Sequence, residues 1–287
     1  MRVLVTGANG QLGSELRVAT AGNGEFFYTD RDTLDICDTD RVERFCMENG
    51  IDMIVNCAAY TAVDRAEEEV EKAFAINADA VRGLATIASR HDLGLVHIST
   101  DYVFDGHTYR PYREDDEVSP KSVYGKSKLE GERAIMEIAP ARCIVIRTSW
   151  VYSEFGTNFV KSMLRLAKER ESLSIVADQV GSPTYASDLA DAILSILPLL
   201  ECDEPRIYHY SNEGVCSWYD FAKAIFDLSG IDISVEPIGT HQYPLPAKRP
   251  PYSVLDKSAI KSEFGLKIPY WRESLRDSLG RVNGGGR

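Results

Sequence analysis

A glycine-rich turn near the start of the chain constrains the fold more than any other feature of the sequence. Residues 6–13 read TGANGQLG and lie between an apolar strand and a helical pattern. Gly7 permits a sharp turn, Gly10 lets the backbone approach a pyrophosphate, and Gly13 lets the helix pack close to the sheet. A strand, a spaced-glycine turn and a helix in this order predict an α/β fold with a phosphate-binding site at its first crossover.

The net charge shows why such a local site is needed. The chain has 287 residues, with 32 Lys and Arg against 44 Asp and Glu, so its formal charge is −12. This charge repels nucleic acid and anionic membranes, and we expect neither as a partner. The free N–H groups and partial positive charge at a helix N-terminus nevertheless attract phosphate. The turn at 6–13 therefore predicts a bound dinucleotide.

Apolar runs and amphipathic helical patterns alternate through the first half of the chain. Strands are expected at 3–6, 26–30, 52–59, 93–100 and 143–148, and helices at 13–21, 38–50, 67–91 and 122–138. Asp38 or Asp40 is expected to cap the second helix and Gly50 to end it. The alternation predicts parallel strands joined by right-handed crossovers, with helices on both faces. The expected fold is an α/β, Rossmann-like doubly wound parallel sheet.

The second half is less regular and predicts a smaller C-terminal substrate-binding lobe. Helices are expected at 158–171, 188–197 and 218–228, strands at 173–176 and 207–211, and a proline-rich loop at 244–251. We expect residues 1–150 to form an NAD(P)-binding Rossmann domain, with parts of 173–211 returning to its sheet. Residues 151–287 are expected to form mainly the lobe. The final GGGR, residues 284–287, is expected to be disordered.

Residues after the second and third strands are predicted to contact the dinucleotide. Asp30 suits a free ribose 2′-hydroxyl, whereas Arg31 suits a 2′-phosphate. The pair points both ways, so we expect either reduced cofactor, NADPH or NADH, to be accepted. Asp35 and Ile36 are placed to flank the adenine. The end of the third strand offers further contacts to the cofactor, and its small side chains allow close approach: Cys57, Ala58, Ala59 and Tyr60.

A second group of polar residues predicts the chemistry. Tyr124 and Lys128 lie four apart on an expected helix, so they share one face. The lysine ammonium is expected to lower the pKa of the phenol, so that Tyr124 donates a proton to a carbonyl oxygen while hydride reaches the carbon. Thr100 or Ser99, at the end of the fourth strand, is placed to hydrogen-bond that oxygen.

Cysteine spacing and hydropathy restrict the class of protein further. None of the six cysteines forms a C-x-x-C pair, and we expect reduced core thiols in a cytoplasmic protein. No apolar run reaches the ~18 residues of a membrane span, and no signal peptide is expected. No metal site is predicted.

These residues resemble the extended short-chain dehydrogenase/reductases and, within them, the dTDP-4-dehydrorhamnose reductase family. The glycine turn, Ser99, Thr100 and the Tyr124/Lys128 pair carry the first resemblance. Four further segments, spread over about residues 1–255 with the turn, carry the second: 56–64 (NCAAYTAVD), 99–106 (STDYVFDG), 147–152 (RTSWVY) and 246–250 (PAKRP).

The resemblance implies reduction of the C4 keto group of dTDP-6-deoxy-L-lyxo-4-hexulose to dTDP-L-rhamnose. It implies Thr100, Tyr124 and Lys128 as the catalytic residues, with Ser99 beside the cofactor and Lys128 also on the nicotinamide ribose. The remaining cofactor contacts are expected from the turn, at Gly7, Gly10, Gln11, Leu12 and Gly13. The sugar is expected near Val63, Asp101, Tyr102 and Trp150, and the nucleotide diphosphate near Asn158 and Arg249. Arg249 also suits pyrophosphate as a cation in a proline-ordered loop.

Two other functions fit the same fold. A nucleotide-sugar epimerase or dehydratase also uses Tyr and Lys, but Tyr102 follows Asp101 where a dehydratase needs a second acid. A non-catalytic dinucleotide-binding regulatory subunit is the other alternative, which the presence of Thr100, Tyr124 and Lys128 disfavours. The expected partner is a dTDP-linked 4-keto-6-deoxyhexose, and a homodimer is a further expectation.

Overall fold

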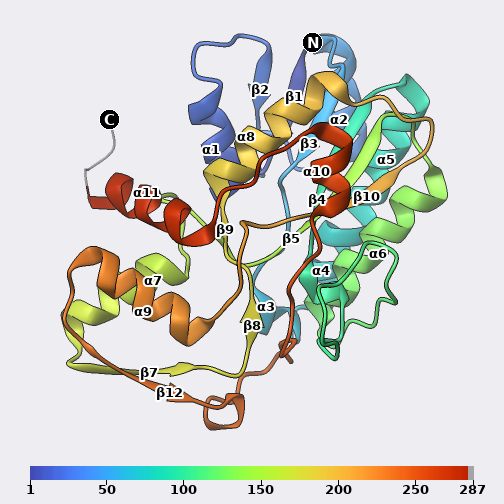
Figure 1. Ribbon diagram of the computed structural model, residues 1–287. Coiled ribbons are helices and arrows are strands. Elements are labelled where there is room, and N and C mark those ends of the chain that lie inside the picture. Colours follow the sequence, from blue (N-terminus) through green and yellow to red (C-terminus); the bar gives the residue numbers. More distant parts are fainter. Residues whose placement is uncertain (284–287) are drawn as a thin grey trace.

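A six-stranded parallel sheet forms the centre of the structure (Figure 1). The computed structural model of the chain describes residues 1–283, so the expectation for residues 284–287 lies outside it. The strand order is β10-β5-β4-β3-β1-β2. The strands are β1 (Val3–Thr6), β2 (Phe26–Tyr28), β3 (Met53–Asn56), β4 (Gly94–Thr100), β5 (Cys143–Thr148) and β10 (Arg206–Tyr210). The doubly wound parallel sheet predicted from the sequence is confirmed.

Helices cover both faces of this sheet, as the continuous apolar strands predict. One face is packed by α1 (Gln11–Ala19) and α8 (Ala186–Ile196), and the other by α2 (Thr39–Asn49), α5 (Ala80–His91) and α6 (Val123–Ile138). Successive β1 side chains point to opposite faces, so Val3 and Val5 join one core and Leu4 the other. Asp38 rather than Asp40 caps α2, accepting from the Arg41 N–H (3.1 Å).

Two predicted elements have different limits in the structure. The third strand ends at Asn56 rather than 59, because the Asn56 carboxamide oxygen accepts from the Ala58 N–H (3.2 Å) and turns the chain. The helix predicted at 67–91 is divided into α4 (Val70–Phe74), a π-helical turn η1 (Ala75–Asp79) and α5. Within η1, the Asn77 side chain bonds the backbone of Tyr60 and the hydroxyl of Ser127, which holds the irregular turn against α6.

The lobe below the sheet in Figure 1 has its own apolar core. Its helices are α7 (Phe159–Glu169), α9 (Trp218–Ser229) and α11 (Trp271–Asn283), and it includes a parallel pair of strands, β7 (Ser172–Val176) and β12 (Ser234–Ile238). Between these strands the chain returns to the sheet, where α8 packs and β10 pairs with β5. β7 pairs with β12 and does not join the main sheet.

Short elements complete the part of the chain that the structure describes. They are α3 (Val63–Ala66), η2 (Asp101–Val103), β6 (Val151–Tyr152), β8 (Val180–Gly181), β9 (Thr184–Tyr185), η3 (Leu197–Leu199), β11 (Cys216–Ser217), η4 (Thr240–Gln242) and α10 (Ser258–Phe264). β6 pairs with β9, and β8 with β11, close to the junction of sheet and lobe.

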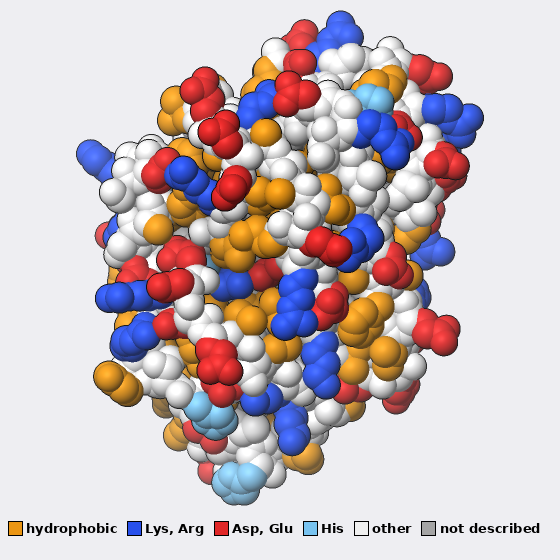
Figure 2. Space-filling view, turned by 90° about the vertical axis from the view of Figure 1, so that its right-hand side faces the viewer, with side chains coloured by type: hydrophobic (Ala, Val, Ile, Leu, Met, Phe, Trp, Pro, Cys, Tyr) orange, Lys and Arg blue, Asp and Glu red, His pale blue; other side chains and the backbone are white. Residues whose placement is uncertain are grey.

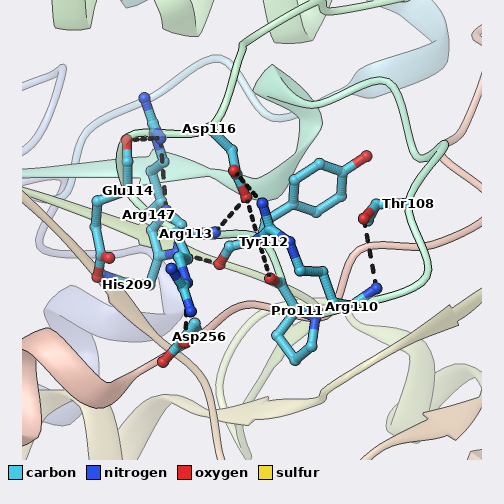
Figure 3. Close-up of polar contacts among 10 residues, drawn as sticks. All are labelled: Thr108, Arg110, Pro111, Tyr112, Arg113, Glu114, Asp116, Arg147, His209 and Asp256. Carbon is cyan, nitrogen blue, oxygen red and sulfur yellow. Dashed lines mark hydrogen bonds and ion pairs between the residues drawn. The ribbon is translucent and has the colours of Figure 1, made fainter.

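The loop between β4 and α6 is held by a buried polar network, part of which Figure 3 shows. Arg147 of β5 forms an ion pair with Glu132 of α6 (2.7 Å) and donates to the backbone carbonyl of Glu114 (3.3 Å). His209 of β10 donates from Nδ1 to the Tyr112 carbonyl (3.1 Å). Burial lowers the pKa of His209 to about 3, with the Arg147 charge acting in the same direction, so the imidazole is neutral. The network fixes a loop whose two ends carry the predicted catalytic residues.

The structure also tests what the sequence predicted about surface charge, membrane spans, cysteines and metal sites. On the face shown in Figure 2, acidic and basic side chains are interspersed. No helix within residues 1–283 is long and apolar enough to span a bilayer. All six cysteines lie in this part of the chain and are unpaired; three are buried, whereas Cys37 is exposed, so the expectation of core thiols is wrong for Cys37. Residues 1–283 contain no group of three or more His, Cys, Asp or Glu side chains that could hold a metal ion.

Candidate active site

A cavity of about 890 Å³ opens at the carboxyl ends of β1, β3 and β4, where ligands bind in sheets of this kind. Most of the predicted site residues line it, although they come from distant parts of the chain. These are Gly7, Gly10, Gln11, Leu12, Asp30, Arg31, Asp35, Ile36, Cys57, Ala58, Ala59, Val63, Ser99, Thr100, Asp101, Tyr102, Tyr124, Lys128 and Trp150.

The glycine turn forms one wall of the cavity. Gly7 has a φ of +64°, and a Cβ there would lie 2.6 Å from the backbone nitrogen of Ala58. A Cβ on Gly13 would lie 2.5 Å from the Gly7 carbonyl oxygen, so this glycine packs beneath the turn rather than lining the cavity. Helix α1 begins after Gly10 without a side-chain cap, so its first N–H groups remain for an anion. The turn therefore fits a pyrophosphate.

Asp30 and Arg31, which gave opposite predictions for the group on the ribose 2′ position of the cofactor, both line the cavity. The Asp30 carboxylate accepts from the Asp32 N–H (3.1 Å), so part of its hydrogen-bonding capacity is used in its own turn. The Arg31 guanidinium lines the cavity, and within residues 1–283 it forms no ion pair. A cation without a protein partner at this position favours a phosphate there.

The predicted catalytic side chains come from two elements. Thr100 is the last residue of β4, and Tyr124 and Lys128 lie on successive turns at the start of α6. Ser122 caps this helix by accepting from the Gly125 N–H (3.1 Å). The Thr100 hydroxyl donates to Asp101 Oδ1 (3.1 Å) and accepts from the Tyr102 N–H (3.2 Å). The Lys128 amine donates to the Ile98 carbonyl (2.7 Å).

The protonation of these groups differs from the sequence-based expectation. Burial raises the pKa of Tyr124 to about 12, the nearby Thr100 hydroxyl lowers it, and the Asp101 carboxyl raises it. Burial also lowers the pKa of Lys128 to about 8. The sequence predicted that the lysine ammonium lowers the pKa of Tyr124. In the structure the protein groups together raise this pKa, so that prediction is wrong for the net shift that they produce. The Lys128 amine is directed to Ile98 and His97, and desolvation outweighs the neighbouring polar groups.

Four predicted site residues do not line the cavity. Gly13 lies under the turn, as described above. Tyr60 is buried and its hydroxyl donates to Glu69 (2.9 Å). Asn158 caps α7, and its amide donates to Gln11 Oε1 (2.9 Å), so it stands behind a lining residue. Arg249 is paired with Asp64 (2.7 Å).

Several cavity residues were missed by the sequence reasoning. Trp218 of α9 stacks on Trp150 with ring centroids 3.6 Å apart, although 68 positions separate them in the chain. Trp150 has a φ of +50°, which is unfavourable for a bulky residue and is held by this stack. No local pattern marks Trp218 as a site residue. The other lining residues that were not predicted are Asn9, Leu34, Cys37, Thr61, Lys72, Ala75, Ile76, Ile98, Thr148, Val151, Gly156, Thr157 and Leu189.

A buried network behind Lys128 was also missed. His97 of β4 is fully buried, and its Nε2 lies 3.2 Å from the Lys128 amine. Its Nδ1 lies 3.0 Å from the Asn56 amide nitrogen, and the Asn56 carboxamide oxygen accepts from the Thr6 hydroxyl (2.6 Å). Three parallel strands are thereby linked to the lysine. This series of side-chain contacts forms because β1, β3 and β4 are neighbours in the sheet. The spacing of the residues in the sequence does not reveal it.

A doubly wound sheet with a glycine turn below a cavity, and with Thr100, Tyr124 and Lys128 at its edge, defines an oxidoreductase of the short-chain dehydrogenase type. The RmlD substrate binding domain family matches residues 1–283, and the chain belongs to this family.

Known relatives are similar over nearly their whole length. The dTDP-4-dehydrorhamnose reductase of Aggregatibacter actinomycetemcomitans is 44% identical, over 96% of this chain and 97% of that protein. The crystal structure of a dTDP-4-dehydrorhamnose reductase from Clostridium acetobutylicum has a TM-score of 0.93 and 42% identity, covering 99% of this chain and 100% of that one. The Bacillus anthracis enzyme of the same name, solved in complex with NADP, has a TM-score of 0.90 and 40% identity, covering 97% and 98%.

Proposed function

We propose that this chain reduces the C4 keto group of dTDP-6-deoxy-L-lyxo-4-hexulose, that is dTDP-4-dehydrorhamnose, to dTDP-L-rhamnose with NADPH. The observation that carries the proposal is one cavity lined by the glycine turn together with Thr100, Tyr124 and Lys128. The full-length relatives named dTDP-4-dehydrorhamnose reductase support the substrate. The overall reaction adds a hydride to C4 and a proton to its oxygen.

The cofactor is assigned from the cavity and from one relative. The pyrophosphate is held by the turn at Gly7 and Gly10 and by the first N–H groups of α1, and the 2′-phosphate by Arg31. The Bacillus anthracis relative binds NADP. When bound, the reduced nicotinamide supplies the hydride, and the protein contributes position and electrostatics.

The proton comes from Tyr124. Its phenol is un-ionised at neutral pH because burial raises its pKa to about 12, so it is available as a donor. The Thr100 hydroxyl lies close enough to stabilise charge that develops on the phenol or on the substrate oxygen. A protonated Lys128 is proposed to add positive charge and to hold the ribose. Its pKa of about 8 leaves it largely charged at neutral pH.

The sugar is proposed to bind between the catalytic residues and the lobe. Val63, Asp101, Tyr102 and Trp150 line this side of the cavity. The Trp150–Trp218 stack supplies a rigid aromatic wall, which is a common surface for the apolar face of a ring. The contact between Arg249 and the nucleotide diphosphate stays a prediction. Arg249 already pairs with Asp64, so the diphosphate would have to bind the guanidinium alongside that carboxylate.

Cofactor consumption tests the proposal. Purified protein is mixed with the dTDP-4-keto sugar and NADPH or NADH, and the absorbance of the reduced nicotinamide is followed while the product is identified by mass and chromatography. One cofactor oxidised for each dTDP-L-rhamnose formed supports the proposal. Conversion of the sugar to an isomer, or to a product that has lost water, without net oxidation of the cofactor indicates an epimerase or a dehydratase. Cofactor binding with no turnover on any 4-keto nucleotide sugar indicates a regulatory subunit.

Two further expectations remain predictions. A homodimer is expected, and light scattering of the purified protein measures its mass. A cytoplasmic location is expected from the reduced thiols, and fractionation of cells that express the tagged chain tests it.

A further inference from the structure

The β6–α7 loop, residues 153–158, contacts the helix that begins at the glycine turn. Gly156 and Thr157 of this loop are exposed and line the cavity, as do Trp150 and Val151 just before it. Gly156 has a φ of +63°, and a Cβ there would lie 3.3 Å from Cγ of Gln11. This part of the cavity wall therefore lies against the first residue of α1.

The side chain of Gln11 holds the loop with both ends of its amide. Its Oε1 accepts from Nδ2 of Asn158 (2.9 Å), and its Nε2 donates to the Val151 carbonyl (3.3 Å). The partners determine how both amides are oriented, because Oδ1 of Asn158 already accepts from the Lys161 N–H (3.1 Å) at the start of α7. The Asn158 amide also donates to the Ser153 carbonyl (2.6 Å), which closes the loop.

A second residue of α1, one turn further along, holds the same loop. The Glu15 carboxyl group, which is 1% exposed, accepts from the Ser153 hydroxyl (2.7 Å). The Ser153 hydroxyl oxygen in turn accepts from the Phe155 N–H (2.9 Å). Because the loop is attached to two successive turns of one helix, its position follows the position of α1.

The backbone of Gln11 faces a different ligand. Helix α1 begins at this residue, after Gly10 and without a side-chain cap, so its N–H is available to the pyrophosphate of the cofactor. Gln11 therefore meets the cofactor with its backbone and the loop with its side chain. A ligand that fixes the start of α1 also fixes the side chain on which the loop is held.

We propose that Gln11 and Asn158 form a latch that couples the binding of the cofactor to the binding of the nucleotide sugar. The inference rests on the proposed function, since it takes NADPH at the turn and the sugar beside Trp150. NADPH fixes the start of α1, the latch holds the β6–α7 loop, and the sugar meets a wall that is already ordered. The second ligand then binds more tightly, because the cost of ordering the loop is already met. Asn158 is thus a positioning residue that acts through Gln11.

Calorimetric titration of dTDP-L-rhamnose, with and without saturating NADPH, measures this coupling. The two ligands do not react with each other, because both are already reduced, so only binding is recorded. In the wild type NADPH should tighten dTDP-L-rhamnose by at least about 5-fold, and dTDP-L-rhamnose should tighten NADPH by the same factor. Gln11→Met keeps the length of the side chain but removes its amide, so this factor should fall to about 1. The Kd of NADPH alone should change little, because the backbone N–H remains.

Asn158→Ser tests the other member of the latch without removing the cap of α7. Serine caps a helix as well as asparagine but is too short to reach Gln11, so the coupling factor should again fall to about 1. The double variant should lose no more coupling than either single variant, because both substitutions break the same contact. Asn49→Ser is the matched control. Asn49 ends α2, donates to the Phe45 carbonyl (2.9 Å) and does not line the cavity, so the coupling should keep its wild-type value.

Hydrogen exchange tests the ordering of the loop without the sugar. NADPH should slow the amide exchange of residues 153–158 in the wild type, and much less in Gln11→Met and Asn158→Ser. Latch variants that weaken both ligands but keep the wild-type coupling factor have lost structure only, and they overturn the latch. A wild-type factor of about 1 also overturns it, even where the sugar is reduced. A wild type that binds NADPH but neither binds dTDP-L-rhamnose nor reduces the dTDP-4-keto sugar overturns the proposed function. The exchange of residues 153–158 then still decides whether the cofactor orders the loop.

Discussion

The buried ion pair between Arg147 and Glu132 provides a quantitative test of how this site is held together. The two side chains are 3% and 2% exposed and lie 2.7 Å apart. Glu132 also accepts from the Ser99 hydroxyl next to Thr100, and Arg147 bonds the loop carbonyl of Glu114. Glu132→Gln removes one charge and leaves the guanidinium buried without its partner. Removing one member of such a pair costs about 3–5 kcal/mol of unfolding free energy.

Helix α6 supplies a matched control for this substitution. Glu137 lies five residues further along the same helix and pairs with Arg82 at 2.8 Å, but these side chains are 67% and 50% exposed. Water screens that pair, so Glu137→Gln should cost under about 1 kcal/mol. Both changes replace a carboxylate by an amide on one helix, so the difference between them isolates the effect of burial.

The assay is urea unfolding followed by tryptophan fluorescence and far-UV circular dichroism, with the wild type and both variants under one condition. The expected result is a large drop in the midpoint for Glu132→Gln at an unchanged slope, and a small drop for Glu137→Gln. The double variant Glu132→Leu with Arg147→Met removes both charges together and should be more stable than Glu132→Gln. Equal midpoints for the Glu132→Gln and Glu137→Gln variants would refute the reasoning, because they would mean that burial adds nothing to the cost.

Three other predictions concern the cavity. Tyr124→Phe should lower kcat by about 10²–10⁴-fold in the reduction assay while NADPH titration shows little change in Kd, since only the proton donor is lost; a large loss of cofactor affinity would contradict this role. Arg31→Ala should raise the Km for NADPH by about 10- to 100-fold and leave that for NADH nearly unchanged, because only the 2′-phosphate loses a charged partner; equal effects on both cofactors would argue against that contact. Gly7→Ala should destabilise the fold by more than about 1 kcal/mol in thermal unfolding and weaken NADPH binding, because its φ is +64° and the new Cβ would meet the Ala58 backbone at 2.6 Å; normal stability and affinity would show that the turn adapts.

Local patterns in the sequence accounted for most of the sheet and for the edge of the site. The predicted strand at 143–148 coincides with β5, and the helix predicted at 122–138 differs from α6 by one residue at its start. Tyr124 and Lys128 were predicted to share a helix face because the helical period is local. Such elements are readable because buried parallel strands are continuously apolar and because cap residues mark where helices begin.

The elements of the lobe were harder to predict from the sequence, because they depend on contacts between distant segments. β12 was not predicted, since Pro237 and polar residues interrupt its pattern, and it forms by pairing with β7, from which it is separated by more than 50 residues. The Trp150–Trp218 wall depends in the same way on two segments brought together by the folded lobe. Pairing partners far apart in the chain leave no signal in a local pattern.

By itself the sequence predicted the strands of the central sheet, most of the helices around it and the glycine turn, because each depends on a few neighbouring residues. It also predicted Thr100, Tyr124 and Lys128 as the reacting groups. Tertiary structure alone decided how those groups are protonated and what stands behind them. The direction of the Lys128 amine, the burial of the Asp101 carboxyl and the His97–Asn56 support follow from packing and strand order. Burial is a property of the packed protein as a whole, and it changes the energy of every charge in the cavity.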